Sequence, residues 1–288
     1  MDLKRALADL QQSQPGRAAG ARDAALARAP LIEIFHSIQG EGRFVGVPMT
    51  FVRTATCPLR CLYCDTPHSY AASARFPVRL GVREQQEPNP CTGERAAELV
   101  RLVATAADPG LRAQRVSITG GEPLVFPQFV RDLGRAVRQR GAKVHLETAA
   151  IHPEALAQCI DQVDHLSADY KLPETLGAPA DRAAALPADG GFGARHRQCC
   201  EIALRRGATV DVKIVLTDRV LDPSFETALA DLGPVRERIL LVLQPVTPFG
   251  AVRTPIARSE LERFVATAQR AQFDVRVLPQ VHKTLQLP

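Results

Sequence analysis

Three cysteines stand close together in the chain and could ligate a metal. Cys57, Cys61 and Cys64 form a C-x3-C-x2-C run within eight residues. Cysteine thiolates bind zinc and iron–sulfur clusters, and a closed tetrahedral site needs four ligands. On a cubane [4Fe–4S] cluster, three thiolates leave one iron open to bind and reduce a small molecule. A zinc site is the alternative, because His68 completes a Cys3His set of suitable spacing.

A second motif, Thr119-Gly-Gly-Glu-Pro123, follows a predicted strand. Glycine has no Cβ, so its main-chain N–H and C=O groups can approach a ligand closely. Alone, the glycine pair could equally be a tight strand–helix connection. One strand beyond the cysteine run, it favours a reactive iron–sulfur site over zinc.

The elements that must position these motifs alternate between strand and helix from residue 49 onward. We expect strands at Met49–Arg53, Arg115–Thr119, Lys143–Glu147, Val163–Ala168, Thr209–Val215, Ile239–Leu243 and Phe273–Val277, with helices near 93–107, 127–140, 153–161, 195–206, 222–232 and 258–271. This order predicts an α/β fold with a parallel sheet. Six such units, with the chemistry at the strand C-termini, suit a partial (β/α)6 barrel, although an open doubly wound sheet also fits the pattern.

Length and composition predict one main domain. The 288 residues are 45% hydrophobic and 23% charged, as in ordinary globular proteins. We assign residues 30–288 to this domain and residues 1–29 to a mobile extension. Residues 69–91 are expected to form a surface insertion or a lid, and residues 174–194 a flexible loop. Neither a secretory signal nor an apolar run long enough for a membrane is evident, so a cytoplasmic protein is expected.

The charged residues argue against one class of partner and mark three positions. A net charge of +5 with no Trp and three Tyr is not the footprint of a nucleic-acid-binding protein. Only five of the 36 basic residues are lysine. In so arginine-rich a chain, a lysine can mark a site that needs a compact point charge. This hypothesis points to Lys171, Lys213 and Lys283.

The two motifs together resemble the radical S-adenosylmethionine (SAM) superfamily. The surrounding blocks resemble 7-carboxy-7-deazaguanine synthases more specifically: Glu33-Ile-Phe-His-Ser-Ile-Gln-Gly-Glu-Gly42, Gly46-Val-Pro48, Phe51-Val-Arg53, Cys64-Asp-Thr66, Leu243-Gln-Pro245 and Leu278–Pro288. The resemblance covers residues 31–288. It implies a radical SAM partial barrel that converts 6-carboxy-5,6,7,8-tetrahydropterin to 7-carboxy-7-deazaguanine with loss of ammonia, in queuosine and 7-deazapurine biosynthesis.

The resemblance also implies roles for individual residues. Cys57, Cys61 and Cys64 would hold the [4Fe–4S] cluster, and Thr66 would ligate Mg²⁺. The pterin substrate would contact Ile38, Gln39, Gly40, Glu41, Arg53, Thr119, His282 and Pro288. SAM would contact Gly121, Glu122, Glu147, Ser167, Asp169, Lys171, Gln244, Pro245, Val246 and Thr247. Two blocks depart from the family pattern: Ala149-Ala150 replaces Asn-Gly, and Ser167-Ala-Asp-Tyr-Lys171 replaces Ser-Pro-Lys.

By resemblance, the enzyme would be a homodimer that receives electrons from a flavodoxin or ferredoxin. The implied reaction begins with one-electron reduction of the cluster, and an adenosyl radical then abstracts hydrogen from C6 of the pterin. A glycyl-radical-activating enzyme is a rival reading. Such activases often carry additional cysteine-rich clusters, which this chain lacks. The non-enzymatic rival is the Cys3His zinc module.

Overall fold

A computed structural model describes residues 26–108, 110, 115–177 and 191–287 of the chain. Most of the expected N-terminal extension, most of the loop at 174–194, and Pro288 lie outside the described residues. No helix in the described part is long and apolar enough to cross a membrane.

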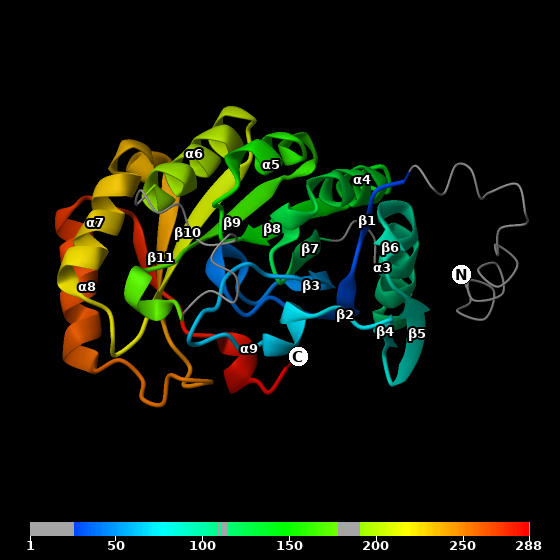
Figure 1. The fold of residues 1–288 in the computed structure, drawn as a ribbon, viewed down its shortest axis with the longest axis horizontal. Coiled ribbons are helices and arrows are strands. Elements are labelled where there is room, and N and C mark those ends of the chain that lie inside the picture. Colours follow the sequence, from blue (N-terminus) through cyan, green and yellow to red (C-terminus); the bar gives the residue numbers. More distant parts are fainter. Residues whose placement is uncertain (1–25, 109, 111–114, 178–190, 288) are drawn as a thin grey trace, which may run out of the picture.

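The centre of the fold is a curved ten-stranded sheet with the spatial order β12-β11-β10-β9-β8-β7-β3-β2-β4-β5 (Figure 1). Seven neighbouring strands are parallel: β3 (Pro48–Thr54), β7 (Arg115–Gly120), β8 (Lys143–Thr148), β9 (His165–Tyr170), β10 (Thr209–Leu216), β11 (Ile239–Pro245) and β12 (Val275–Val277). They match the seven expected strands closely. The parallel α/β architecture and the partial barrel are therefore confirmed, because the sheet ends at β12 and β5 without closing.

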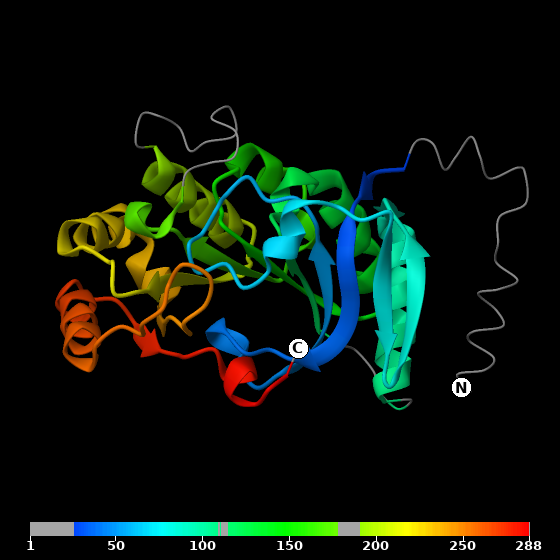
Figure 2. The same ribbon diagram turned by 60° about the horizontal axis from the view of Figure 1, so that its bottom comes forward.

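Helices cover the outer face of the curved sheet, as Figures 1 and 2 show. They are α3 (Gly93–Ala107), α4 (Pro127–Arg138), α5 (Pro153–Ala157), α6 (Phe192–Arg205), α7 (Asp222–Leu232) and α8 (Arg258–Arg270). Proline in the first turn pre-sets the start of α4, α5 and α7. The main core lies between helices and sheet, where Phe129, Leu133 and Phe225 are fully buried. These crossovers leave every strand-to-helix loop at the C-terminal edge of the parallel strands.

Three strands that we did not expect extend the sheet beyond β3. β2 (Leu31–Ile38) pairs antiparallel with β3, and the hairpin of β4 (Arg75–Leu80) and β5 (Arg83–Pro88) joins through β2. A separate small sheet joins β1 (Arg28–Ala29) to β6 (Cys91–Thr92). Residues 75–88 of the expected insertion thus form a sheet-edge hairpin that contributes no residue to the pocket described below, whereas Ser69 of the same segment lines it.

Short 3-10 turns and a C-terminal helix complete the described part. The turns are η1 (Gly42–Phe44), η2 (Pro67–Tyr70), η3 (Pro123–Val125), η4 (Ile160–Gln162), η5 (Pro173–Thr175) and η7 (Gly233–Arg238). After β12 the chain crosses back toward the end of β2 and forms α9 (Val281–Thr284) (Figure 2). There the backbone N–H of Val281 donates to Gly40 at 3.0 Å. This return places the segment around α9 against the loop after β2.

Candidate active site

The C-terminal ends of the parallel strands surround a pocket of about 200 Å³. Its lining draws on the loops after β2, β3, β7, β8, β9 and β11, on β10, and on the segment around α9. The predicted site residues among the lining are Ile38, Gln39, Gly40, Glu41, Arg53, Cys57, Cys61, Cys64, Thr66, Thr119, Gly121, Glu122, Glu147, Asp169, Lys171, Gln244, Val246 and His282. Ser167, Pro245 and Thr247 do not line it, and Pro288 lies outside the described residues.

The cysteine loop forms one wall of this pocket. Cys57, Cys61 and Cys64 are half-buried and free, and all three line the cavity. Burial raises the pKa of the Cys57 thiol to about 12 and also raises that of Cys61. Metal ligation requires thiolates, so cluster binding must displace these protons.

A zinc ion and an iron–sulfur cluster place different demands on the cysteine loop. A single zinc ion needs its four ligands around one point. Across the described residues, no group of three or more His, Cys, Asp or Glu side chains could hold one metal ion. A cubane cluster takes each thiolate on a different iron atom, so it does not require that convergence.

The Gly-Gly-Glu-Pro turn packs directly against the cysteine loop. The N–H groups of Gly121 and Glu122 donate to Thr54 O at 2.7 Å and Thr56 O at 2.8 Å. A Cβ on Gly120 would meet the Thr54 backbone at 2.3 Å, and one on Gly121 would meet Thr56 O at 2.3 Å. The sequence argument that the glycines admit a ligand was therefore incomplete, because both glycines are first needed for contact between two loops.

Glu122 ties the same turn to the end of β8. The carboxylate is 1% exposed, and it accepts from Thr148 Oγ1 at 2.5 Å and from the Ala149 N–H at 2.8 Å. Burial raises its pKa despite these donors. Both oxygens are occupied by protein groups, so this side chain braces the turn.

Arg53 lies at the pocket wall with its charge supported from behind. The Arg53 guanidinium lies 3.5 Å from the Glu33 carboxylate, and Glu33 also pairs with Arg79 at 2.9 Å. The same Arg53 guanidinium stacks over the Phe35 ring, 5.0 Å from the ring centroid. Two arginines thus share one buried carboxylate, so Glu33 cannot neutralise both, and Arg53 lines the pocket. This wall suits an anionic group on a ligand.

All three lysines flagged by the sequence are at or beside the pocket. Lys171 pairs with Asp169 at 2.8 Å, and Lys213 lies between Asp169, at 3.0 Å, and Glu41. Burial alone would lower the pKa values of both lysines, but the neighbouring Asp169 charge raises them. Lys283 on α9 pairs with Asp65 at 2.9 Å.

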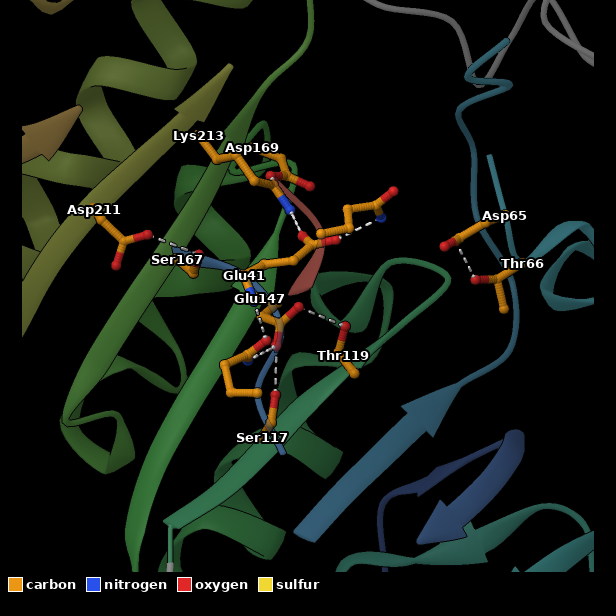
Figure 3. A network of polar contacts seen from close by, with 12 residues as sticks. Glu41, Asp65, Thr66, Ser117, Thr119, Glu147, Ser167, Asp169, Asp211 and Lys213 are labelled. Carbon is orange, nitrogen blue, oxygen red and sulfur yellow. Dashed lines mark hydrogen bonds and ion pairs between the residues drawn. The ribbon is translucent and has the colours of Figure 1, made fainter. Parts of the chain in front are cut away.

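Glu147 at the end of β8 joins several pocket residues (Figure 3). It accepts from Gln39 Nε2 at 2.8 Å, Ser117 Oγ at 2.7 Å and Thr119 Oγ1 at 3.2 Å. Burial would raise its pKa, but His145, Lys213 and these hydrogen bonds lower it overall. The carboxylate is therefore ionised and accepts every one of these bonds.

Other contacts escaped the sequence argument. Gln280 lines the pocket and donates to Glu41 at 2.7 Å, and Tyr63 lies under Lys171 with its ring centroid 5.4 Å from the ammonium. Ser167 instead donates to buried Asp211 at 3.1 Å, behind the pocket. The C-terminal block Leu278–Pro288 is recognisable as a motif in the sequence. Its contact with Glu41 through Gln280 depends on the fold, which brings this segment back to the loop after β2.

Comparison with known proteins decides the family. The family model of the Radical SAM superfamily matches residues 51–171. A 7-carboxy-7-deazaguanine synthase of Methanopyrus kandleri is 37% identical over 254 residues, which cover 87% of this chain and 91% of that protein. The chain belongs to the 7-carboxy-7-deazaguanine synthase family. The family member from Geobacter sulfurreducens is 34% identical, covering 88% of this chain and 96% of its own length.

Solved structures support the fold. QueE from Escherichia coli superposes with a TM-score of 0.55 at 22% identity, over 88% of this chain and 95% of that one. A radical SAM methyltransferase from Sphaerobacter thermophilus gives a TM-score of 0.51 at 16% identity, over 94% and 83% of the two chains.

Family membership implies a [4Fe–4S] cluster and SAM, and the pocket residues fit both groups. Three free thiols that line the pocket would supply three iron ligands. Gln244 is 3% exposed at the pocket, and its Oε1 has no hydrogen-bond partner in the described part of the chain. A buried acceptor without a partner is costly unless a ligand donates to it.

Proposed function

We propose that this enzyme converts 6-carboxy-5,6,7,8-tetrahydropterin to 7-carboxy-7-deazaguanine with loss of ammonia. The observation that carries the proposal is one pocket lined by the cysteine run, the Gly-Gly-Glu-Pro turn and the charge-supported Arg53. When bound, the cluster and SAM would supply the one-electron and radical chemistry that the reaction needs, with the electron coming from an external donor. The protein supplies binding and orientation.

Different residues of the chain bind the substrate and SAM. Arg53 grips the substrate carboxylate, while Gln39, Glu41 and Thr119 face the heterocycle. Gln244 and the Lys171–Asp169 pair face SAM. The ion pairs that Asp169 makes with Lys171 and Lys213 hold these side chains in place before ligands bind.

Thr66 is the protein ligand that we assign to Mg²⁺. Its hydroxyl donates to Asp65 Oδ1 at 2.9 Å, and Lys283 pairs with Asp65 Oδ2. A hydroxyl whose hydrogen is taken by a carboxylate turns its lone pairs toward a cation. Substrate oxygens and water would complete the octahedron that Mg²⁺ prefers. A flavodoxin or ferredoxin as electron donor, a homodimeric assembly and a cytoplasmic location complete the proposal.

The test is anaerobic turnover with reconstituted protein, the tetrahydropterin, SAM, Mg²⁺ and a chemical reductant. Formation of 7-carboxy-7-deazaguanine by the wild type and none by Cys61→Ser is the expected result. A colourless zinc protein would support the binding-module alternative. A radical on a protein partner without pterin turnover would support an activase.

The magnesium assignment predicts a specific change in the same assay. Thr66→Val should raise the Mg²⁺ concentration for half-maximal activity by roughly 10-fold, because one oxygen ligand is lost. Thr66→Ser keeps the hydroxyl and is the matched control. Equal activity of the wild type with and without a chelator of divalent ions would remove the magnesium role.

A further inference from the structure

Glu147 accepts hydrogen bonds from the two residues that are expected to contact the pterin ring. Gln39 on the β2 loop and Thr119 at the end of β7 both donate to it, although they are far apart in sequence. Figure 3 shows Thr119 beside Glu147. Its side chain is 21% exposed, at the pocket lining. We propose that Glu147 is a positioning residue that fixes the donor and acceptor polarity of the substrate wall, rather than a SAM contact. This inference rests on the proposed function.

The polarity of Thr119 follows from its partner. An ionised carboxylate only accepts hydrogen bonds, so the Thr119 hydroxyl must give its single hydrogen to Glu147 Oε2. Only lone pairs then remain for a ligand. Thr119 therefore presents an acceptor, and the substrate group opposite must be an N–H or O–H donor.

Gln39 is fixed at both ends of its amide. Its Nε2 donates to Glu147 at 2.8 Å, and its Oε1 accepts from the Glu41 N–H at 3.0 Å. Since one end needs a donor and the other an acceptor, the amide cannot flip. Its second N–H remains available to donate to a ligand acceptor.

Two further side chains keep Glu147 charged and in place. Ser117 donates to Oε1 at 2.7 Å from within β7, where it is fully buried. Lys213 contributes positive charge from β10. The wall thus offers a donor from Gln39 and an acceptor from Thr119. A pterin edge, which carries amino and ring N–H donors beside a carbonyl acceptor, complements that pair.

The test replaces the carboxylate with an amide of the same shape. Glu147→Gln can donate to the hydroxyl and amide groups around it, so the polarity of the wall is no longer fixed. We expect the Kd of 6-carboxy-5,6,7,8-tetrahydropterin to rise roughly 10- to 100-fold. The Kd of SAM, measured separately on the reconstituted enzyme without reductant, should change less than about 2-fold.

Two further variants serve as controls for this experiment. Glu87→Gln makes the same change at a buried carboxylate outside the pocket, where Arg95 is its partner at 2.9 Å. It should leave both Kd values unchanged and report any loss from reduced stability. Thr119→Val should weaken pterin binding in the wild type but add less than about 2-fold in the Glu147→Gln background, because the hydroxyl orientation is already lost.

Each outcome bears on a different claim. A wild type that neither binds nor converts the pterin defeats the proposed function. If the wild type does both and Glu147→Gln binds pterin equally well, only the positioning role is overturned. A SAM Kd that rises as much as the pterin Kd would likewise overturn it and return Glu147 to the cofactor side.

Discussion

At the scale of single residues, the pocket contains polar and charged side chains that are each held by a second residue. Arg53 has Glu33 behind it, Thr66 has Asp65, and Lys213 has Asp169. Such pairing fixes side-chain geometry before any ligand arrives, which lowers the cost of binding. Substitutions that break these pairs should therefore be costly.

Arg53→Lys should lower kcat/KM for the carboxylated pterin by roughly 100-fold, mainly through KM, because a point charge cannot reproduce a bidentate guanidinium grip. The Phe35 stacking contact would also be weakened. Arg75→Lys is the matched control, since Arg75 is exposed and hydrogen-bonds only to the Gln86 carbonyl among the described contacts. Steady-state kinetics decide: an unchanged KM would remove Arg53 from the carboxylate site.

His145 predicts a dependence of stability on pH. Its side chain is 1% exposed, and burial lowers its pKa from 6.5 to about 4. The unfolded chain therefore binds more protons than the folded one between these values, so stability falls as pH falls through this window. From pH 7 to pH 5 the loss from this group is about 2 kcal/mol. Urea unfolding at the two pH values measures it, and His145→Phe should lose less stability over the same interval.

At the scale of elements, the apolar strands and amphipathic helices were predictable because burial imposes their pattern. β10 reads Thr-Val-Asp-Val-Lys-Ile-Val-Leu and is almost wholly buried. The hairpin was not predictable, because β5 reads Arg-Glu-Gln-Gln-Glu-Pro and is mostly exposed at the sheet edge. β2 was also not predicted as a strand, because its residues Glu33–Ile38 were read only as part of a family motif.

The contact between the loops after β3 and β7 gives a prediction at this scale. Gly120→Ala places a Cβ 2.3 Å from the Thr54 backbone at a φ of +117°. We expect a loss of about 3 kcal/mol or more in unfolding free energy and less iron bound after reconstitution. Gly141→Ala is the control, since φ is +84° there with nothing within 4 Å. It should cost about 1 kcal/mol. Equal losses would show that the close contact is unimportant.

Among site residues, motif matching found those in the strand-end loops but could not reveal their contacts. The family motif assigns Glu147 to the cofactor, yet two of the side chains that donate hydrogen bonds to it, Gln39 and Thr119, are expected substrate contacts. Lys213 was flagged only by the scarcity of lysine. The contacts of Lys213 depend on the tertiary fold. The sheet order places β10 beside β9, and the loop after β2 brings Glu41 to Lys213.

At the scale of the whole molecule, the open side of the partial barrel is partly spanned by the returning C-terminal segment. Its contacts include Gln280 with Glu41 at 2.7 Å, Val281 with Gly40 at 3.0 Å, and Lys283 with Asp65 at 2.9 Å. None of the α9 residues is buried. The segment therefore contributes to the site more than to the core.

Gln280→Ala should consequently separate function from stability. Loss of its bond to Glu41 should raise KM for the pterin by roughly 10-fold, because the hydrogen bond is to a charged group. The melting temperature should stay within about 2 °C, as expected for a substitution outside the core. Steady-state kinetics measure the KM and thermal unfolding measures the melting temperature, both on the same preparation. A large fall in melting temperature with unchanged KM would contradict this division.

The return of the chain end to the pocket rim also governs how the enzyme should be handled in the laboratory. A purification tag or fluorescent fusion joined after residue 288 would follow α9 by only four residues, and α9 itself lies at the pocket rim. Kinetic constants measured on such a fusion would include the effect of its linker. A handle inserted at the β4–β5 turn, where Val82 is fully exposed and outside the pocket lining, would leave the rim free.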